Sequence, residues 1–478
     1  MHKHIIIVGG GTAGWSTAAI LSTNTDITIT ILDPSNIPII GVGESTLPHL
    51  HLAHRAMKLP ILQTNEWANS VDATIKLGIG FENFYTKNSR WLHPFLDAAD
   101  IDRITLAKAI RYGYYKNIDN QWDFASKYTW AGSRLKNGFI ERTDWFTNYK
   151  TAANGGGGAF HINAVKYSSL LKTTVKDRPN VRLIDSVVSN IKQNDLGEIE
   201  SIVLDNGQQV TADLYIDCTG FASILSNAVE SPWTSVSDRL FVDQALVVQL
   251  PYIKEQLQKT NLTTCTGLSS GWVFNIPLDT RIGTGYIHAS RYIDSDNAKL
   301  EFKDYLTNRW GYNLEDIDLR LIKFRTGFRP NLWHKNVVSV GLSGFFCEPI
   351  ESTAIAIANY AVMLLNEYIQ TKNIPLQTFK DKFNLEMKEQ HNDILDFVTA
   401  HYQLTARDDS AFWKDYKNLP LPNNITNLMN EFVNQHREST LDDDKFHSLI
   451  GRKVGMFHLW SYTALFLGNK IIPQNCKA

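Results

Sequence analysis

A glutamate stands directly before a long apolar segment that is expected to be helical. Glu351 precedes Ser352 and Thr353, and the helix-favouring run begins at Ala354. Serine and threonine are favoured N-cap residues, and the first N–H groups of a helix carry positive partial charge, so this turn suits an anion. Glu351 can accept a proton from a substrate carbon or stabilise a cationic intermediate. Helix-dipole electrostatics alone also explain a carboxylate at this position.

A single lysine interrupts the apolar, glycine-bearing run 75–81. Lys76 stands between Ile75 and Leu77. Lysine is almost never fully buried, and most lysines in such runs extend the ammonium to the surface. A buried lysine offers more chemistry, because its ammonium has three donors and its deprotonated amine is a nucleophile. The residues alone leave both interpretations open.

A glycine-rich turn follows the apolar run 4–8. It reads Gly-Gly-Gly-Thr-Ala-Gly at positions 9–14 and precedes a helix-like segment. Strand, tight turn and helix are the context in which Gly-x-Gly-x-x-Gly indicates dinucleotide binding. We expect Gly9 to permit the turn, Gly11 to let the backbone approach a pyrophosphate, and Gly14 to allow close helix packing.

A carboxylate ends the next expected strand. The segment 27–32 alternates isoleucine with threonine and ends at Asp33, about 20 residues after Gly14, where an acid can accept hydrogen bonds from ribose hydroxyls. The alternative is a glycine turn without a ligand and a solvated aspartate. The joint occurrence of fingerprint, helix and acid favours the dinucleotide site.

Two aromatic residues alternate in the heptapeptide Gly-Trp-Val-Phe-Asn-Ile-Pro at 271–277. Trp272 and Phe274 would leave the same face of a strand. An aromatic pair in a hydrophobic core is the commoner explanation of this spacing.

Length and composition limit the classes of partner. The chain has 478 residues, 43% of them hydrophobic, a formal net charge of −2 and a pI near 6.7. We therefore expect two or three domains and a small-molecule partner, with no nucleic acid and no membrane. The four cysteines form no Cys-x-x-Cys pair, which predicts neither disulfides nor a metal site. No apolar run reaches the ~20 residues of a membrane span or forms a signal peptide, so a soluble, cytoplasmic protein is expected.

The order of elements predicts an α/β (α+β) fold. Residues 182–204 suggest paired strands, and 212–220 suggest a strand similar to the second nucleotide-contacting strand of large FAD enzymes. Alternating apolar runs from 240 to 330 indicate an antiparallel sheet, and residues 354–369 and 379–404 have helical periodicity.

We therefore expect a discontinuous, Rossmann-like FAD-binding domain of the glutathione-reductase/monooxygenase type over 1–380. A substrate-side antiparallel sheet would be inserted at about 60–150 and 230–330, and a mainly helical C-terminal cap would follow over 381–478.

Several segments, in the same order, resemble flavin-dependent halogenases of the tryptophan-halogenase family. Residues 75–81 are similar to the family's Lys-Leu-Gly-Ile-x-Phe, 344–354 to Glu-Pro-Leu-Glu-Ser-Thr-Gly, and 271–277 to Trp-x-Trp-x-Ile-Pro. Residues 41–48 resemble the family's strap segment on the flavin side. Further matches to the family are found at 93–95, 212–221, 325–327 and 401–409. Phe274 replaces the family's second tryptophan, and Ala354 replaces its glycine.

The resemblance implies a halogenase that depends on FADH2 and O2. Halide would attack a flavin hydroperoxide and give hypohalous acid, which Lys76 would hold or trap for attack on an electron-rich, indole-like or phenolic substrate. Glu351 would assist loss of the proton. No second dinucleotide fingerprint is apparent, so a separate flavin reductase would supply FADH2. Oligomeric state is left open, with a homo-oligomer among the alternatives.

The resemblance also assigns roles to single residues. Lys76 and Glu351 would be catalytic, Thr353 and Ala354 would bind halide through backbone N–H groups, and His93 and Phe95 would contact the substrate. Trp272, Phe274, Ile276 and Pro277 would separate flavin from substrate. FAD would contact Gly9, Gly10, Gly11, Thr12, Ala13, Gly14, Asp33, Ile37, Val42, Glu44, Ser45, Val188, Leu342, Ser352 and Ile355. No metal is expected.

The two departures from the family carry their own expectations. Alanine at 354 is tolerable only with negative φ or at the cost of strain. We expect that Phe274 and Ala354 alter the halide and flavin pocket and favour bromide or iodide over chloride. Alternatives on the same scaffold are a flavin-dependent monooxygenase, which needs neither halide nor Lys76, and an FAD-binding protein that has lost catalysis. An NAD-dependent dehydrogenase fits the halogenase-like segments less well.

Overall fold

The computed structural model describes residues 3–37, 44–59, 61–62, 64–95, 109, 121–135, 139–141, 158–313, 317–371, 374–435 and 453–472. The chain folds as two compact units, each assembled from three segments. Unit 1 comprises Met1–Asp72, Ile162–Val236 and Arg325–His391, and unit 2 comprises Ala73–His161, Ser237–Phe324 and Asn392–Ala478. Residues 392–478, which make up most of the helical C-terminal cap expected over 381–478, are grouped with the segments 73–161 and 237–324.

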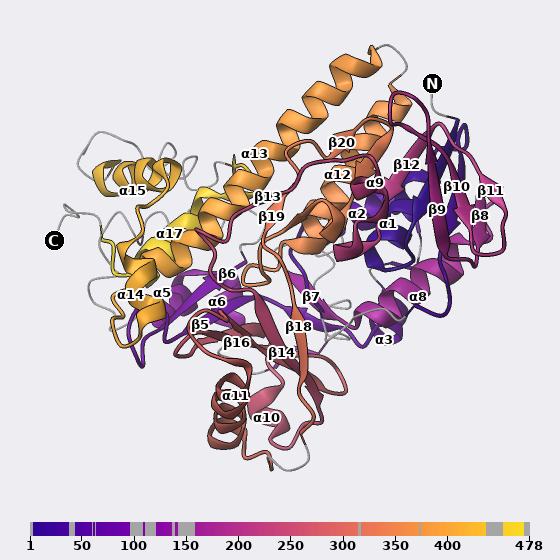
Figure 1. Cartoon of the computed structure of the whole chain (residues 1–478). Helices are drawn as coiled ribbons and strands as arrows, with labels where there is room; N and C mark the ends of the chain where they lie inside the picture. The colour runs from indigo at the N-terminus through magenta and orange to yellow at the C-terminus, as the bar shows by residue number, and fades with distance from the viewer. Residues whose placement is uncertain are drawn as a thin grey trace. The chain divides into compact units, whose positions relative to one another are not determined.

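Unit 1 is built on a six-stranded, mostly parallel sheet (Figure 1). The strand order is β20–β21–β12–β1–β2–β8, and only β20 and β21 pair antiparallel. Residues 5–7 of β1 are fully buried, as expected for a central parallel strand covered on both faces. The strands are β1 (His4–Val8), β2 (Thr28–Leu32), β8 (Val181–Ile184), β12 (Leu214–Asp217), β20 (Trp333–His334) and β21 (Val337–Ser339).

Helix α1 is the central helix of unit 1 and packs against α8 and α12. Its residues from Gly14 to Leu21 are all buried, which fits a helix that is apolar all round. The helices of this unit are α1 (Thr12–Leu21), α2 (Leu50–Met57), α3 (Asn65–Ser70), α8 (Ala164–Val175), α9 (Ile224–Ala228) and α12 (Ala354–Gln370), with short 3₁₀ turns η3 (Gly220–Ala222) and η4 (Gly341–Ser343).

Short strands complete unit 1. Strands β9 (Val188–Gln193), β10 (Ile199–Leu204) and β11 (Gln209–Val210) form an antiparallel sheet, as do β13 (Thr234–Ser235), β19 (Gly327–Phe328) and β22 (Phe345–Phe346). The paired strands expected over 182–204 are β9 and β10, with Gly197 at φ +72° in their turn. The first residues of that segment belong instead to β8, because they pair parallel with β2.

Unit 2 is built on a seven-stranded sheet ordered β18–β14–β17–β16–β15–β5–β6. Its neighbouring strands are antiparallel except β15 and β5, which pair parallel. The strands are β5 (Gly78–Glu82), β6 (Arg90–Pro94), β14 (Gln244–Leu250), β15 (Leu262–Gly267), β16 (Gly271–Pro277), β17 (Ile282–His288) and β18 (Arg320–Lys323), and a further antiparallel pair is β4 (Thr74–Lys76) with β7 (Ala159–Ile162).

Helices surround this sheet and dominate the C-terminal region (Figure 1). Helix α11 packs Phe302 and Leu306 against Leu246 and Val273 of the sheet. The helices are α5 (Gln121–Tyr128), α6 (Trp130–Leu135), α10 (Glu255–Gln258), α11 (Ser295–Trp310), α14 (Ala411–Asn418), α15 (Asn423–Gln435) and α17 (Leu459–Gly468), and β23 (Lys453–Val454) pairs with β24 (Phe457–His458). Helix α13 (Leu376–Gln403) begins in unit 1 and ends in unit 2. The mixed α/β fold with a helical C-terminal region confirms the expected fold class.

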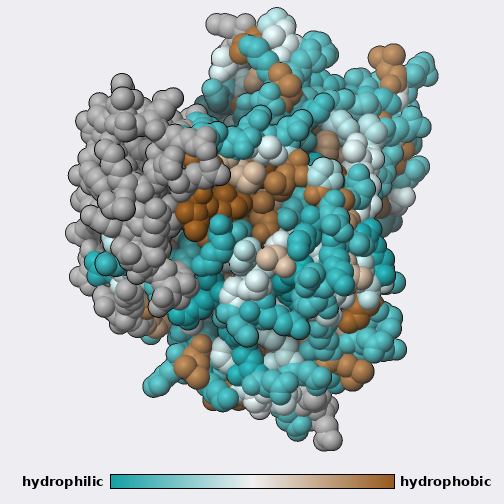
Figure 2. All heavy atoms as spheres, turned by 90° about the vertical axis from the view of Figure 1, so that its left-hand side faces the viewer, coloured by the Kyte–Doolittle hydropathy of each residue, from teal (hydrophilic) through white to brown (hydrophobic). Residues whose placement is uncertain are grey.

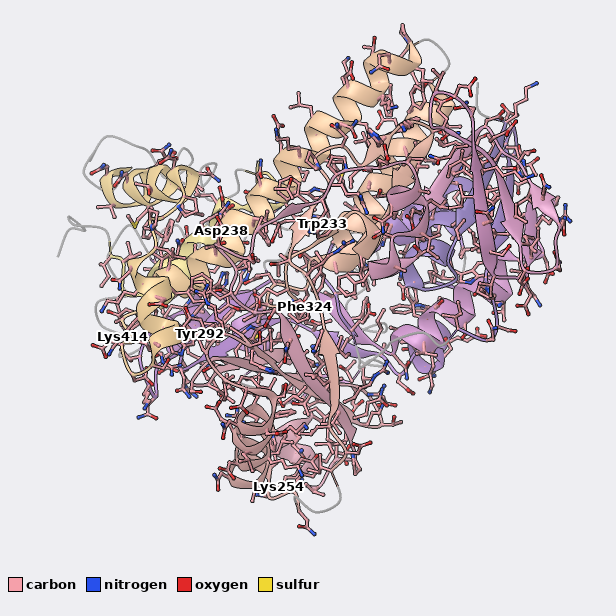
Figure 3. All side chains as sticks on the ribbon, viewed as in Figure 1. Trp233, Asp238, Lys254, Tyr292, Phe324 and Lys414 are labelled. Atoms are coloured by element: carbon pink, nitrogen blue, oxygen red, sulfur yellow. The ribbon has the colours of Figure 1, made fainter. Side chains whose placement is uncertain are left out.

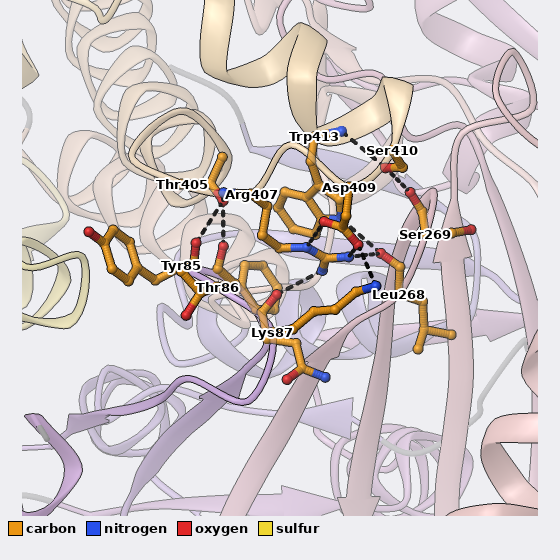
Figure 4. A network of polar contacts seen from close by, with 12 residues as sticks. Tyr85, Thr86, Lys87, Leu268, Ser269, Thr405, Arg407, Asp409, Ser410 and Trp413 are labelled. Atoms are coloured by element: carbon orange, nitrogen blue, oxygen red, sulfur yellow. Dashed lines mark hydrogen bonds and ion pairs between the residues drawn. The ribbon is translucent and has the colours of Figure 1, made fainter.

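Arg407 fixes the turn after α13 to the sheet of unit 2 (Figure 4). Its guanidinium donates to both carboxylate oxygens of Asp409 at 2.8 and 2.9 Å and to the carbonyls of Asn83 and Leu268 at 2.8 and 3.1 Å. It also lies 4.3 Å from the ring centroid of Trp413. These partners offset the cost of burying the guanidinium, and they explain why the region after α13 belongs to unit 2.

Helix α14 makes a further link to the same sheet. The Tyr292 hydroxyl donates to Asp415 at 2.6 Å, and Figure 3 shows Tyr292 beside Lys414, the neighbour of that aspartate. The Tyr416 hydroxyl accepts from the Phe241 backbone N–H at 2.7 Å. Helix α14 is therefore bonded to the segments that adjoin strands β14 and β17.

The surface is mainly hydrophilic on the face drawn in Figure 2, where hydrophobic residues gather in one larger patch and are otherwise scattered. Scattered hydrophobic surface residues are ordinary in folded proteins. Among the described residues, no helix has the length and apolar character needed to cross a bilayer.

Candidate active site

The glycine turn has the geometry that its sequence predicts. Gly9 has φ +112°, and a Cβ there would lie 2.3 Å from the carbonyl oxygen of Cys218. A Cβ at Gly14 would lie 1.8 Å from the Gly9 carbonyl oxygen. At Gly11, by contrast, no described atom lies within 4 Å of the Cβ position. Gly9 and Gly14 are therefore required for close packing, whereas Gly11 leaves the backbone open to a ligand.

Helix α1 begins at this opening. Its N-cap, Gly11, has no side chain to bond the first N–H groups of the helix, and Thr12 and Ala13 are only partly buried. Such a helix start binds the phosphates of a nucleotide through N–H donors and the helix dipole. The turn therefore fits the pyrophosphate of a dinucleotide such as FAD.

The Asp33 carboxylate is held by two partners that the sequence did not indicate. Its Oδ2 atom accepts from the Lys172 ammonium at 2.6 Å and from the Trp15 indole N–H at 3.1 Å. Its other oxygen lies against Gly10, where a Cβ would come within 1.6 Å. Lys172 is distant from Asp33 in sequence, so no local pattern predicts this ion pair.

The other expected flavin residues that the structure describes lie in unit 1. Glu44 and Ser45 form the short strand β3, and burial raises the pKa of the Glu44 carboxyl to about 7. Ile37 is exposed and Ser352 is buried, whereas three others are partly buried: Val188 in β9, Leu342 in η4 and Ile355 in α12. Val42 lies outside the described residues.

The turn before α12 holds the residues expected to bind halide. Glu351 is fully buried, and Thr353 is the N-cap with φ −81°. The Thr353 side chain makes no capping hydrogen bond to the described backbone and lies instead 4.0 Å from the Cys347 sulfur. Ala354 begins the helix without a positive φ, so replacing glycine introduces no backbone strain there. The left-handed residue of this turn is Ser352, with φ +59°.

Cys347 adds no negative charge to this turn. Burial, and then the nearby Glu348, raise the pKa of its thiol to about 12. The thiol is therefore neutral at physiological pH beside the start of α12.

Lys76 is fully buried at the end of β4, so its ammonium does not extend to the surface. The Nζ atom lies 5.0 Å from the ring centroid of Phe95. The Phe95 and His93 rings meet edge to face, with centroids 6.1 Å apart. Phe397, which lies on α13, also packs its ring against His93, with centroids 6.1 Å apart. The structure thus brings three predicted residues, Lys76, Phe95 and His93, into one cluster.

The His93 ring has a further partner. Its Nε2 atom lies 3.0 Å from the Ser461 hydroxyl on α17. Ser461 was not predicted, because nothing in the sequence near 461 marks one serine of a buried helix as a partner for a histidine so far away in the chain.

The heptapeptide 271–277 forms strand β16, and all seven of its residues are buried. Trp272 and Phe274 share one face, with ring centroids 6.2 Å apart. At the end of the strand, the Pro277 carbonyl accepts from the Thr74 hydroxyl at 2.5 Å. This bond ties β16 to β4, the strand that carries Lys76.

The predicted residues therefore form two groups. The glycine turn, Asp33, Glu351 and the start of α12 belong to unit 1, whereas Lys76, the rings around it and strand β16 belong to unit 2. A parallel sheet with an open glycine turn is typical of the dinucleotide-binding domains of large flavoenzymes.

Comparison with known proteins narrows this class. A family model described as tryptophan halogenase matches residues 4–478. The chain is 31% identical to the tryptophan 7-halogenase RebH of Lentzea aerocolonigenes over 447 residues, which cover 87% of this chain and 79% of the relative. It is 27% identical to the tryptophan 6-halogenase ThaL of Streptomyces albogriseolus over 500 residues, which cover 99% of this chain and 90% of the relative. The chain belongs to the tryptophan halogenase family.

Solved structures agree with this assignment. The chain resembles a flavin-dependent halogenase from Xanthomonas campestris with a TM-score of 0.82 and 28% identity, over 99% of this chain and 90% of that one. A likeness to the halogenase BrvH from Brevundimonas sp. BAL3 has a TM-score of 0.79 and 26% identity, over 99% and 91%. The predicted family and enzyme class, a halogenating oxidoreductase, are confirmed. Enzymes of this family depend on flavin, receive it reduced from an external reductase and act on small aromatic substrates.

Proposed function

We propose that this chain is an FADH2- and O2-dependent halogenase that forms hypohalous acid and delivers it through Lys76 to an electron-rich aromatic substrate. The observation that carries the proposal is the full burial of Lys76 beside the rings of Phe95 and His93. Burying an ammonium costs free energy. Buried titratable groups of this kind gather at functional sites, and this supports a chemical role for the Lys76 nitrogen.

The glycine turn and Asp33 would hold the cofactor. The open side of Gly11 and the N–H groups of α1 receive the pyrophosphate, and Asp33, oriented by Trp15 and Lys172, receives the ribose. Bound FADH2 with O2 supplies the oxidising equivalent that converts halide into hypohalous acid.

The start of α12 would hold the halide. The first N–H groups of a helix have no intrahelical partner, and α12 presents them at an exposed Ala354. The neutral Cys347 thiol does not repel an anion there. Because Ala354 keeps a negative φ, its N–H keeps the direction that helix geometry imposes.

Lys76 and Glu351 would divide the remaining chemistry. The Lys76 ammonium can hold hypohalous acid by hydrogen bonds, or its amine can exchange a proton for halogen with release of water. The aromatic carbon then takes the halogen, and Glu351 accepts the proton that this carbon loses. Trp272 and Phe274 keep the organic substrate away from the flavin, so that halide is oxidised first.

The side chains near Lys76 support the proposed substrate class. The rings of Phe95, His93 and Phe397 suit a flat aromatic such as an indole or a phenol. The two relatives named above are tryptophan halogenases, and tryptophan is therefore one candidate to test. We propose the wider class of electron-rich indoles and phenols.

A reconstituted reaction tests the proposal. Protein, FAD, a flavin reductase, NADH and air are incubated with an indole or a phenol and with chloride, bromide or iodide in turn, and mass shifts are measured. Halogenated product is expected, with Lys76→Ala retaining FAD binding and losing product. Products in which the substrate has gained oxygen but no halogen would instead indicate a monooxygenase. Bound FAD without any product would indicate lost catalysis. Phe274→Trp and Ala354→Gly variants test the expected preference for bromide or iodide.

A further inference from the structure

A buried histidine lies on the strand that pairs with the Lys76 strand. In the antiparallel pair of β4 and β7, Thr74 stands opposite His161 and Lys76 opposite Ala159. Alternate residues of a strand share a face, so Thr74, Lys76 and His161 leave the same face of this pair. His161 is fully buried. The sequence did not mark His161, and the proposed chemistry does not use it.

Both ring nitrogens of His161 have a hydroxyl partner. Nδ1 lies 2.8 Å from the Thr74 hydroxyl, and Nε2 lies 3.0 Å from the Thr263 hydroxyl. Thr74 donates its single hydroxyl hydrogen to the Pro277 carbonyl. Thr74 must therefore accept from Nδ1–H, which leaves Nε2 as the acceptor from Thr263 in a neutral imidazole.

Electrostatics favour the same neutral form. Burial, and then the positive charge of Lys76, hold the pKa of His161 well below its usual range. A neutral imidazole can donate and accept beside a lysine without repelling it. A second cation at this position would repel Lys76 across a medium of low dielectric constant.

The hydrogen-bond chain reaches four strands. It joins Thr263 on β15 and His161 on β7 to Thr74 on β4, and Thr74 to the Pro277 carbonyl of β16. Asn261 fixes the backbone next to Lys76 independently, because its side-chain amide donates to the Ile75 carbonyl at 3.0 Å and its own carbonyl accepts from the Leu77 N–H at 2.7 Å. Thr74 supplies the side-chain link between the lysine strand and the 271–277 strand, and His161 holds the Thr74 hydroxyl that makes this link.

We propose that His161 is a positioning residue for Lys76. As a neutral imidazole it orients the Thr74 hydroxyl, and Thr74 in turn fixes the lysine strand against the end of β16, so that oxidant reaching Lys76 is passed to the substrate. The inference rests on the proposed function. Its physical basis is that transfer between held groups depends steeply on their placement, and an error of about 1 Å can cost about 100-fold in rate.

The test separates oxidant formation from oxidant transfer. Wild type, His161→Leu and His161→Asn are each supplied with FAD, reductase, NADH and bromide, and free hypobromous acid is measured with a β-diketone scavenger while brominated indole is measured by mass. Total oxidant is the sum of free hypobromous acid and brominated indole. For His161→Leu we expect the FAD affinity and the total oxidant to stay within about twofold of wild type. The ratio of brominated indole to total oxidant should fall by about 10-fold or more. His161→Asn keeps an N–H near the Nδ1 position and should recover much of the ratio.

A matched control removes another buried imidazole of unit 2. The Nδ1 atom of His288 on β17 contacts the carbonyl of Tyr286 two residues away, and His288→Leu should leave the ratio unchanged. NMR of wild type with 15N-labelled histidine should show His161 as the neutral Nδ1–H tautomer from pH 6 to 8. An imidazolium, the other tautomer, or a folded His161→Leu variant with a full transfer ratio would overturn the inference. Wild type without any halogenated product would overturn the proposed function itself, and the inference with it.

Discussion

Phe274 of β16 lies directly opposite Gly285 of β17, and the missing side chain of the glycine provides the space that the phenylalanine ring fills. A Cβ at position 285 would lie 2.6 Å from the Cζ atom of Phe274. The aromatic residue that departs from the family pattern is thus matched to a glycine on the neighbouring strand. Neither position can be changed without affecting the other.

Gly285→Ala should therefore destabilise the protein. The added methyl would meet the Phe274 ring and also lie 2.9 Å from the Leu246 carbonyl oxygen, so we expect a loss of about 2 kcal/mol, typical of overpacking. Thermal unfolding of wild type and variant measures the loss. In a Phe274→Leu background the same substitution should cost less, because the shorter side chain no longer reaches position 285. Equal costs in both backgrounds would mean that the two residues do not constrain each other.

Lys76→Met should abolish halogenation while leaving the fold at least as stable. The variant removes a buried ammonium and keeps most of its volume, a change that is often neutral or stabilising, and we expect product formation to fall at least about 100-fold. FAD titration and product yield measure the two effects. The matched control is Lys259→Met, which removes a mostly buried lysine of unit 2 that pairs with Asp279. Product yield should be unchanged in the control, and a productive Lys76→Met variant would refute the role of the lysine.

The sequence predicted those features that depend on neighbours in the chain. The glycine turn could be predicted because φ at Gly9 and the contact of Gly14 with Gly9 are local consequences of one short segment. Lys76 and Phe95 were predicted only through family resemblance, since no periodicity shows that a lysine in an apolar run is buried beside a particular ring.

Partners contributed from distant segments could not be predicted. Lys172 reaches Asp33, His161 reaches Thr74, and Ser461 reaches His93 only because the strands and helices bring them together. Single hydrogen bonds of this kind leave no spacing pattern in the sequence. The strand pairing was predicted in outline, but the parallel pair of β5 and β15 was missed because alternation does not reveal strand direction.

Asp393 should make stability depend on pH. Burial raises the pKa of its carboxyl to about 6, above the usual 3.8, so the folded state binds this proton more tightly than the unfolded state. Its contribution is therefore fully present below about pH 4 and is lost as the pH rises through about 6, a change of about 3 kcal/mol at about 1.4 kcal/mol per pKa unit. The difference in unfolding free energy between wild type and Asp393→Asn, measured by denaturant titration from pH 4 to 7.5, isolates this contribution. A difference that stays constant over that range would contradict the shifted pKa.

Ser461→Ala should weaken substrate binding without loss of the chemical step. The Ser461 hydroxyl lies 3.0 Å from Nε2 of His93, and without it the imidazole loses one of the contacts that set its orientation against Phe95 and Phe397. A lost hydrogen bond is worth about 1 kcal/mol, so we expect KM for the aromatic substrate to rise about fivefold while kcat stays within about twofold. Ser461→Thr keeps the hydroxyl and should restore KM. Thr463→Ala is the control on the same helix, because the Thr463 hydroxyl bonds only the local carbonyl of Leu459 among the described residues. If KM were unchanged in Ser461→Ala, or rose equally in Thr463→Ala, His93 would not be held by Ser461 for substrate binding.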